Sequence, residues 1–208
     1  MKKSHVVQLV TGVFAIGLAW ILIDRSIMAP RRNFERFLKV LATAKVGATK
    51  LEDLRQQLAQ EQVSNLVLKC EGQEGSVGLR VENKFLKEVR LSPQTIADAG
   101  VGFANGTASE IYIALVIAKK NDNGEWRDDK GVVVRETTER IEACSPHFDV
   151  SVKGRYGTSD RDWATVAMGP CVQAEDRAKA LAFNCACLTR IGGCSTVEAI
   201  LPKVFTKP

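Results

Sequence analysis

VVQLVTGVFAIGLAWILI, from Val6 to Ile23, decides the fold of this chain, because its eighteen residues are apolar apart from Gln8 and Thr11. At about 1.5 Å per helical residue it spans about 27 Å, close to the thickness of the hydrocarbon core of a bilayer. The sequence therefore predicts a single transmembrane helix over residues 6–23, preceded by a short basic tail, residues 1–5.

A cleaved secretory signal is the alternative for this stretch. The apolar core of a signal is about 7–15 residues long and ends in small residues before the cut. Here the run ends in Trp20-Ile21-Leu22-Ile23, and the nearest small residue, Ala29, is followed by Pro30. We therefore interpret the stretch as a retained signal-anchor.

The basic charge of the chain lies beside the anchor. The net charge is +5, yet residues 51–208 hold 20 basic and 22 acidic side chains, whereas residues 24–50 hold seven basic and two acidic ones. This distribution indicates attraction to anionic lipid headgroups and argues against a nucleic-acid partner. The side chains predicted to lie at the membrane surface are Arg25, Arg31, Arg32, Arg36 and Lys39.

Two signals conflict over which side of the membrane holds the rest of the chain. Positive charge after the span favours a cytoplasmic location for the domain that follows it. Two lysines before the span and an even number of cysteines, all beyond it, favour export to an oxidising compartment. We expect a single-pass protein whose C-terminal domain is periplasmic or otherwise extracytoplasmic. The disulfide candidates are Cys70, Cys144, Cys171, Cys185, Cys187 and Cys194.

Residues 24–62 are predicted to form a basic, juxtamembrane helical stalk, which could self-associate. Phe34, Phe37, Leu38 and Leu41 follow helical spacing, so they form an apolar stripe that either lies on the bilayer or packs on a domain or partner helix. A capping box at Thr49-Lys50-Leu51-Glu52 then predicts a second helix to about residue 62.

Residues 63–208 are predicted to form the exported β domain. Apolar and polar residues alternate with period two, which is typical of half-buried strands. The short strands and turns predict an antiparallel sandwich or barrel, followed by a short C-terminal helix and a closing strand. The expected strands cover residues 66–70, 77–81, 85–91, 101–107, 110–118, 126–134, 138–143, 148–154 and 163–168; the helix covers 174–182 and the last strand Val197–Phe205.

Residues 101–188 combine an Asn-x-Thr strand, a Trp-bearing turn and spaced cysteines. These are Phe103-x-Asn105-x-Thr107, Gly124-x-Trp126, and Cys144, Cys171 and Cys185 or Cys187. The set resembles a bacterial family of small secreted proteins of unknown function, although that family's doubled Trp and Gly-Trp pattern is replaced here by Asp128-Asp129-Lys130-Gly131. The resemblance implies an exported, disulfide-bonded β domain and brings no activity with it.

The sequence holds no phosphate-binding Gly loop, no His-Glu-x-x-His and no Gly-x-Ser-x-Gly, so no catalytic residue, metal site or cofactor is predicted. We expect a non-enzymatic accessory, scaffolding or protein-interaction subunit, whose candidate partners are the lipid bilayer, other envelope or membrane proteins and a second copy of the chain. One alternative is a ligand- or glycan-binding module that stacks its ligand on Trp126, Tyr156 and Trp163. Another is a metal or redox enzyme built on the terminal cysteines.

Overall fold

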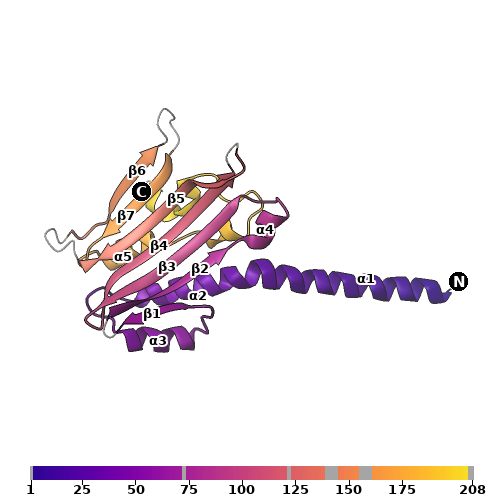
Figure 1. The fold of residues 1–208 in the computed structure, drawn as a ribbon, viewed down its shortest axis with the longest axis horizontal. Helices are drawn as coiled ribbons and strands as arrows, with labels where there is room; N and C mark the ends of the chain where they lie inside the picture. Colours follow the sequence, from indigo (N-terminus) through magenta and orange to yellow (C-terminus); the bar gives the residue numbers. More distant parts are fainter. Residues whose placement is uncertain (1, 72–73, 121–122, 139–144, 155–160, 206–208) are drawn as a thin grey trace.

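An unbroken run of helix leads from the N-terminal region into the domain (Figure 1). It consists of α1 (Lys2–Ile23), one π-helical segment η1 (Asp24–Met28) and α2 (Ala29–Thr43), and the backbone stays right-handed helical at both junctions. Within the described part of the chain, one helix near the N-terminus is long and apolar enough to span a membrane, and its apolar window is not buried. The computed structural model describes residues 2–71, 74–120, 123–138, 145–154 and 161–205.

The seven described strands form one mixed sheet in the order β1-β2-β3-β4-β5-β7-β6. Neighbouring strands are antiparallel except β5 and β7, which are parallel. The chain passes from β5 to the edge strand β6 and returns as β7, which lies between the two. The strands are β1 (Val67–Glu71), β2 (Glu74–Glu82), β3 (Gln94–Ala104), β4 (Thr107–Lys120), β5 (Trp126–Thr137), β6 (Asp149–Gly154) and β7 (Arg161–Met168).

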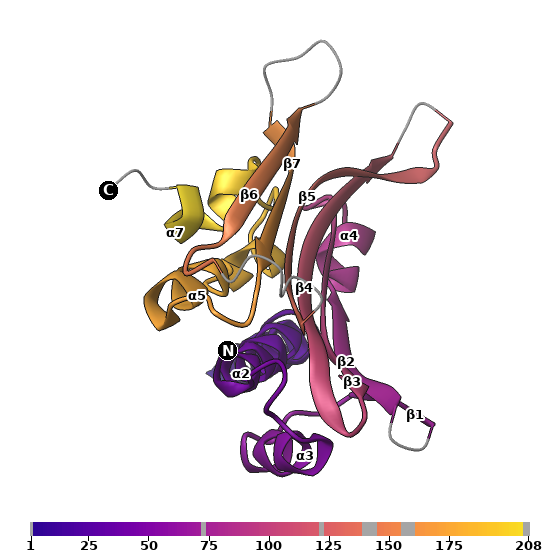
Figure 2. The ribbon, with the colours of Figure 1, turned by 90° about the vertical axis from the view of Figure 1, so that its left-hand side faces the viewer.

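The prediction of a sandwich or barrel is wrong, because the sheet is open and helices cover one of its faces (Figure 2). A strand with one covered face alternates with period two whatever covers that face, so the pattern does not distinguish a second sheet from a helical layer. Most of the expected strands are found, but the single strand expected at residues 101–107 is wrong. Its first four residues end β3, Asn105 and Gly106 form a turn with positive φ, and Thr107 begins β4. The segment 138–143 lies almost wholly outside the described residues.

α2 lies at the centre of the covered face. Phe34, Phe37 and Leu41 are fully buried there, in one apolar cluster with strand residues such as Ile113 and Leu115. Of the two alternatives for the apolar stripe, the structure therefore shows packing on the domain. α2 is part of the core, so the long apolar helix α1 joins the domain through the interior of the domain.

A second helix, α3 (Leu51–Gln60), packs beside α2. The sequence predicts this helix, but the capping box expected at Thr49-Lys50-Leu51-Glu52 is wrong. The N-cap residue is Lys50, and the hydroxyl of Thr49 accepts a hydrogen bond from the backbone N–H of Lys45. The buried side chains of α3 are Leu54 and Leu58.

The C-terminal part consists of short helical segments. The helix predicted at 174–182 is present, whereas the strand predicted at 197–205 is wrong. Thr196 accepts a hydrogen bond from the N–H of Ala199 and so caps a helical turn, and Pro202 lacks the N–H that a central strand would need. The segments are α5 (Ala174–Ala180), η3 (Cys185–Leu188), α6 (Val197–Ile200) and α7 (Pro202–Phe205).

Arg177 of α5 joins the C-terminal end of α2 to the sheet. Its Nε donates to the buried carboxylate of Glu136 on β5 at 2.9 Å, and its other nitrogens donate to the carbonyls of Leu41, Ala42 and Ala44. The last carbonyls of a helix lack partners within the helix and favour a positive charge. Burial raises the pKa of Glu136, and the adjacent guanidinium partly offsets that rise.

Candidate functional site

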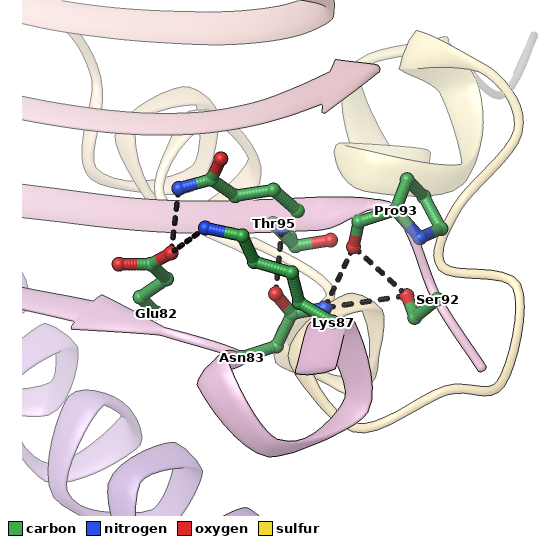
Figure 3. Close-up of polar contacts among 7 residues, drawn as sticks. Glu82, Asn83, Lys87, Ser92, Pro93 and Thr95 are labelled. Carbon is green, nitrogen blue, oxygen red and sulfur yellow. Dashed lines mark hydrogen bonds and ion pairs between the residues drawn. The ribbon is translucent and has the colours of Figure 1, made fainter. Parts of the chain in front are cut away.

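The segment between β2 and β3 is held as a fixed loop around α4 (Lys84–Glu88). The buried Asn83 joins the two ends of this loop (Figure 3): its Nδ2 donates to Ser92 Oγ at 3.2 Å and to the carbonyl of Pro93 at 2.9 Å. Its Oδ1 accepts from the N–H of Thr95 at 2.8 Å. A buried amide with these partners holds the loop in one conformation.

Glu82 reinforces the same loop, accepting from Lys87 Nζ at 3.2 Å and from Gln94 Nε2 at 2.5 Å. The strand expected at residues 85–91 is wrong, because α4 is a helix. These residues form a helical turn and a return, in which Arg90 has a positive φ of 58°.

A basic cavity of about 640 Å³ lies between this loop and the β4–β5 hairpin. The ammonium groups of Lys87 and Lys120 lie 4.9 Å and 5.6 Å from the centroid of the Trp126 ring, within the range of a cation–π interaction. The lining holds three cationic side chains and the carboxylate of Glu88, and Lys87 is also paired with Glu82 at 3.2 Å, so the remaining charge of +1 favours a bound anion. The lining residues are Lys87, Glu88, Arg90, Leu91, Ser92, Pro93, Lys120 and Trp126.

Of the three residues predicted to stack a ligand, the structure describes Trp126 and Trp163, and their rings have different neighbours. Trp126 is already in contact with two lysines. The ring of Trp163 lies over Gly131, where an added Cβ would come within 2.6 Å of it. Tyr156 lies outside the described residues.

Sequence analysis found Trp126 but missed the basic residues around it. The sequence predicts Lys87 and Arg90 on a strand, where residues three apart point to opposite faces. Lys120 is at the end of a strand whose partner begins at Trp126. That hairpin pairing was the available signal for part of the cavity.

The basic residues predicted for the membrane surface lie along one run of helix. Arg25 and Arg36 are exposed, and Arg31 is half-buried. Lys39 lies sixteen residues beyond Ile23, which is about 24 Å along a helix. Three of them form ion pairs. The pairs are Arg31–Glu35 at 2.7 Å, Arg32–Asp24 at 2.9 Å and Lys39–Glu61 at 2.6 Å.

The cysteines show disulfide bonding. Cys187 and Cys194 are bonded to each other, and Cys171 is also in a disulfide. Cys144 and the side chain of Cys70 lie outside what the structure describes. A disulfide favours an oxidising compartment.

Cys185 is a buried free thiol. Burial raises its pKa to about 12, so its reactive thiolate is scarce at neutral pH, whereas a redox nucleophile needs a lowered pKa. Within the described residues, no group of three or more His, Cys, Asp or Glu side chains could hold a metal ion.

The bonded and free cysteines predict a labelling pattern for protein taken from native membranes. Denatured without a reductant, the chain should react with maleimide at Cys185 and stay unmodified at Cys171, Cys187 and Cys194. Peptide mass spectrometry would measure this, with a reduced sample as the control in which all four react. Labelling of Cys187 and Cys194 before reduction would mean that the domain matures in a reducing compartment.

His147 lies at the surface with its Nδ1 2.6 Å from Asp176 Oδ2. The hydrogen bond from His147, followed by one from Lys179, lowers the pKa of Asp176. The neighbouring Cys144 is outside the described residues. This pair stabilises the junction between α5 and the loop before β6.

Taken together, the fold and these surfaces define a class: an open, helix-backed mixed sheet attached through its core to a membrane-length helix. Comparisons of the chain with protein-family models, curated proteins and solved structures found no match. The resemblance of residues 101–188 to small secreted proteins stays a prediction.

Proposed function

We propose that this protein is a single-pass, membrane-anchored accessory or scaffolding subunit that presents its sheet domain to another membrane or envelope protein. The domain is on the extracytoplasmic side. The bonded cysteines support this placement, since disulfides persist in oxidising compartments.

The observation that carries the proposal is the continuity of the helix from α1 into the core. A flexible linker would let the domain rotate freely relative to its anchor. Here the helix that leaves the apolar segment continues through η1 into α2, whose Phe34 and Phe37 are fully buried. The anchor therefore fixes the height and the orientation of the domain above a bilayer, as a scaffolding subunit requires.

The outer face of the sheet is the surface available for a partner. It is opposite the helical layer, and among the described elements no helix lies across its centre (Figure 2). Tyr112 and Trp163 lie on it with their rings against Gly100 and Gly131, so the face presents flat aromatic surface of the kind enriched in protein interfaces.

Photocrosslinking in native membranes tests this function. A photoreactive benzoylphenylalanine at Tyr112 or at the exposed Arg135 should give discrete adducts with a second membrane protein or a second copy. The same group at Gln56, exposed on α3, is the control and should give none. If neither outer-face position forms an adduct, the interaction role is wrong.

A further inference from the structure

α4 lies at the end of the domain from which α1 leaves (Figure 1). It contacts η1 directly, and a narrow crevice between the two is lined by Ile27, Pro30, Leu86 and Leu188 among others. η1 begins immediately after Ile23, the last residue of the membrane-length segment. α4 therefore lies beside the helical segment that directly follows α1.

Large apolar side chains are exposed at this end of the domain. Phe85, Val89 and Leu91 are 36–47% exposed on α4 and its return, and Ile191 is 69% exposed on a neighbouring turn. That turn is tied to the return by a hydrogen bond of 2.9 Å from the N–H of Gly192 to the carbonyl of Leu91. Exposed apolar residues gathered at one place indicate a contact surface.

Basic side chains surround these apolar ones. Lys84, Arg90 and Arg190 are exposed, and Glu88 is the exposed carboxylate on the same helical turn. Apolar groups with a basic rim match the interface of an anionic bilayer, where apolar groups enter the acyl boundary and basic groups bind headgroups.

We propose that residues 84–91 and 190–192, named here the α4 platform, form a second membrane contact that binds a bilayer containing anionic lipid. This second contact depends on the membrane anchor proposed above, because α1 brings the α4 platform to the lipid. Phe85, Val89, Leu91 and Ile191 enter the interface. Lys84, Arg90 and Arg190 bind headgroup phosphates.

The platform is preformed, which lowers the entropic cost of binding. Asn83 closes the loop from inside, with hydrogen bonds to Ser92, Pro93 and Thr95. The basic cavity shares Lys87, Glu88, Arg90 and Leu91 with the platform. An anionic headgroup therefore has a cationic recess beside the apolar contact.

Lipid photolabelling of the full chain tests this inference. The protein is reconstituted in vesicles of phosphatidylcholine with phosphatidylglycerol, a diazirine-bearing lipid is activated, and labelled peptides are mapped by mass spectrometry. We expect label in α1 and in the α4 platform. Combining Phe85→Ser, Leu91→Ser and Ile191→Ser should lower platform labelling about tenfold relative to α1, because each inserted apolar group contributes a several-fold factor.

Leu68→Ser is the matched control. Leu68 is 52% exposed on the edge strand β1. Its partner Val77 lies five residues before Glu82, where β2 ends and the segment that carries the platform begins. The substitution is therefore remote from the platform and should leave the labelling unchanged. A variant combining Lys84→Gln, Arg90→Gln and Arg190→Gln should lose platform label in anionic vesicles and change little in phosphatidylcholine alone.

The outcomes separate the two proposals. Label in α1 with none in the platform overturns the second contact and leaves the anchor standing. Absence of label from α1 overturns the anchor and the platform together. Platform label that persists in the triple serine variant overturns the assignment to these side chains.

Discussion

Replacing Arg177 with methionine should lower the free energy of unfolding by about 3–5 kcal/mol, the usual cost of leaving one partner of a buried ion pair without the other. The substitution removes the partner of Glu136, whose side chain is 4% exposed, and uncaps the carbonyls at the end of α2. Denaturant unfolding of the full chain in detergent micelles would measure the loss.

The same variant should show a defined dependence on pH. Arg177 lowers the pKa of Glu136 against the effect of burial, so its removal raises that pKa further. A carboxyl whose pKa is raised in the folded state contributes stability below its unfolded pKa, and this contribution is lost as the pH rises through the folded pKa. The difference between wild type and Arg177→Met should therefore be smaller near pH 4 than near pH 8.

Two controls accompany this prediction. Glu175→Gln removes an exposed carboxylate from the same helix, whose bridge to Lys179 is a surface pair, and should change stability by at most about 0.5 kcal/mol. Adding Glu136→Leu to Arg177→Met removes the stranded carboxyl and should recover part of the loss. A cost for Arg177→Met no larger than that of Glu175→Gln would contradict the role given to the pair.

Replacing Phe37 with alanine should cost about 3–5 kcal/mol, the range for truncating a buried aromatic side chain. Phe37 is fully buried between α2 and the sheet, so truncation leaves a cavity where the helix that continues from α1 packs on the domain. Loss of the near-UV circular dichroism of the domain on denaturant titration measures the effect.

Arg36→Ala is the matched control on the same helix. Its side chain is exposed, and surface substitutions away from special contacts usually change stability by no more than about 0.5 kcal/mol. Equal effects of the two substitutions would mean that the stripe of α2 is not buried against the sheet, which would favour the alternative interpretation that it lies on the bilayer, and would remove the main support for a fixed domain orientation.

The features that the sequence alone determined are local ones. The unbroken apolar run from Val6 to Ile23 predicts a long apolar helix, because every residue contributes to the pattern. The period-two alternation in residues 66–81 and 110–118 predicts β1, β2 and β4, because each strand covers one face with its own side chains, whereas only the last residues of β3 are expected as strand.

The tertiary structure decided what covers each apolar face and which distant residues meet. The stripe from Phe34 to Leu41 has the same spacing whether it meets lipid or a sheet, since periodicity reports a buried face and not its cover. The parallel pairing of β5 with β7, and the contact of Arg177 with Glu136 across 41 positions, depend on chain reversals that no local pattern encodes. The basic cavity at Trp126 exists for the same reason: Lys87 is on α4 and Lys120 is at the end of β4, and only folding places both against one ring.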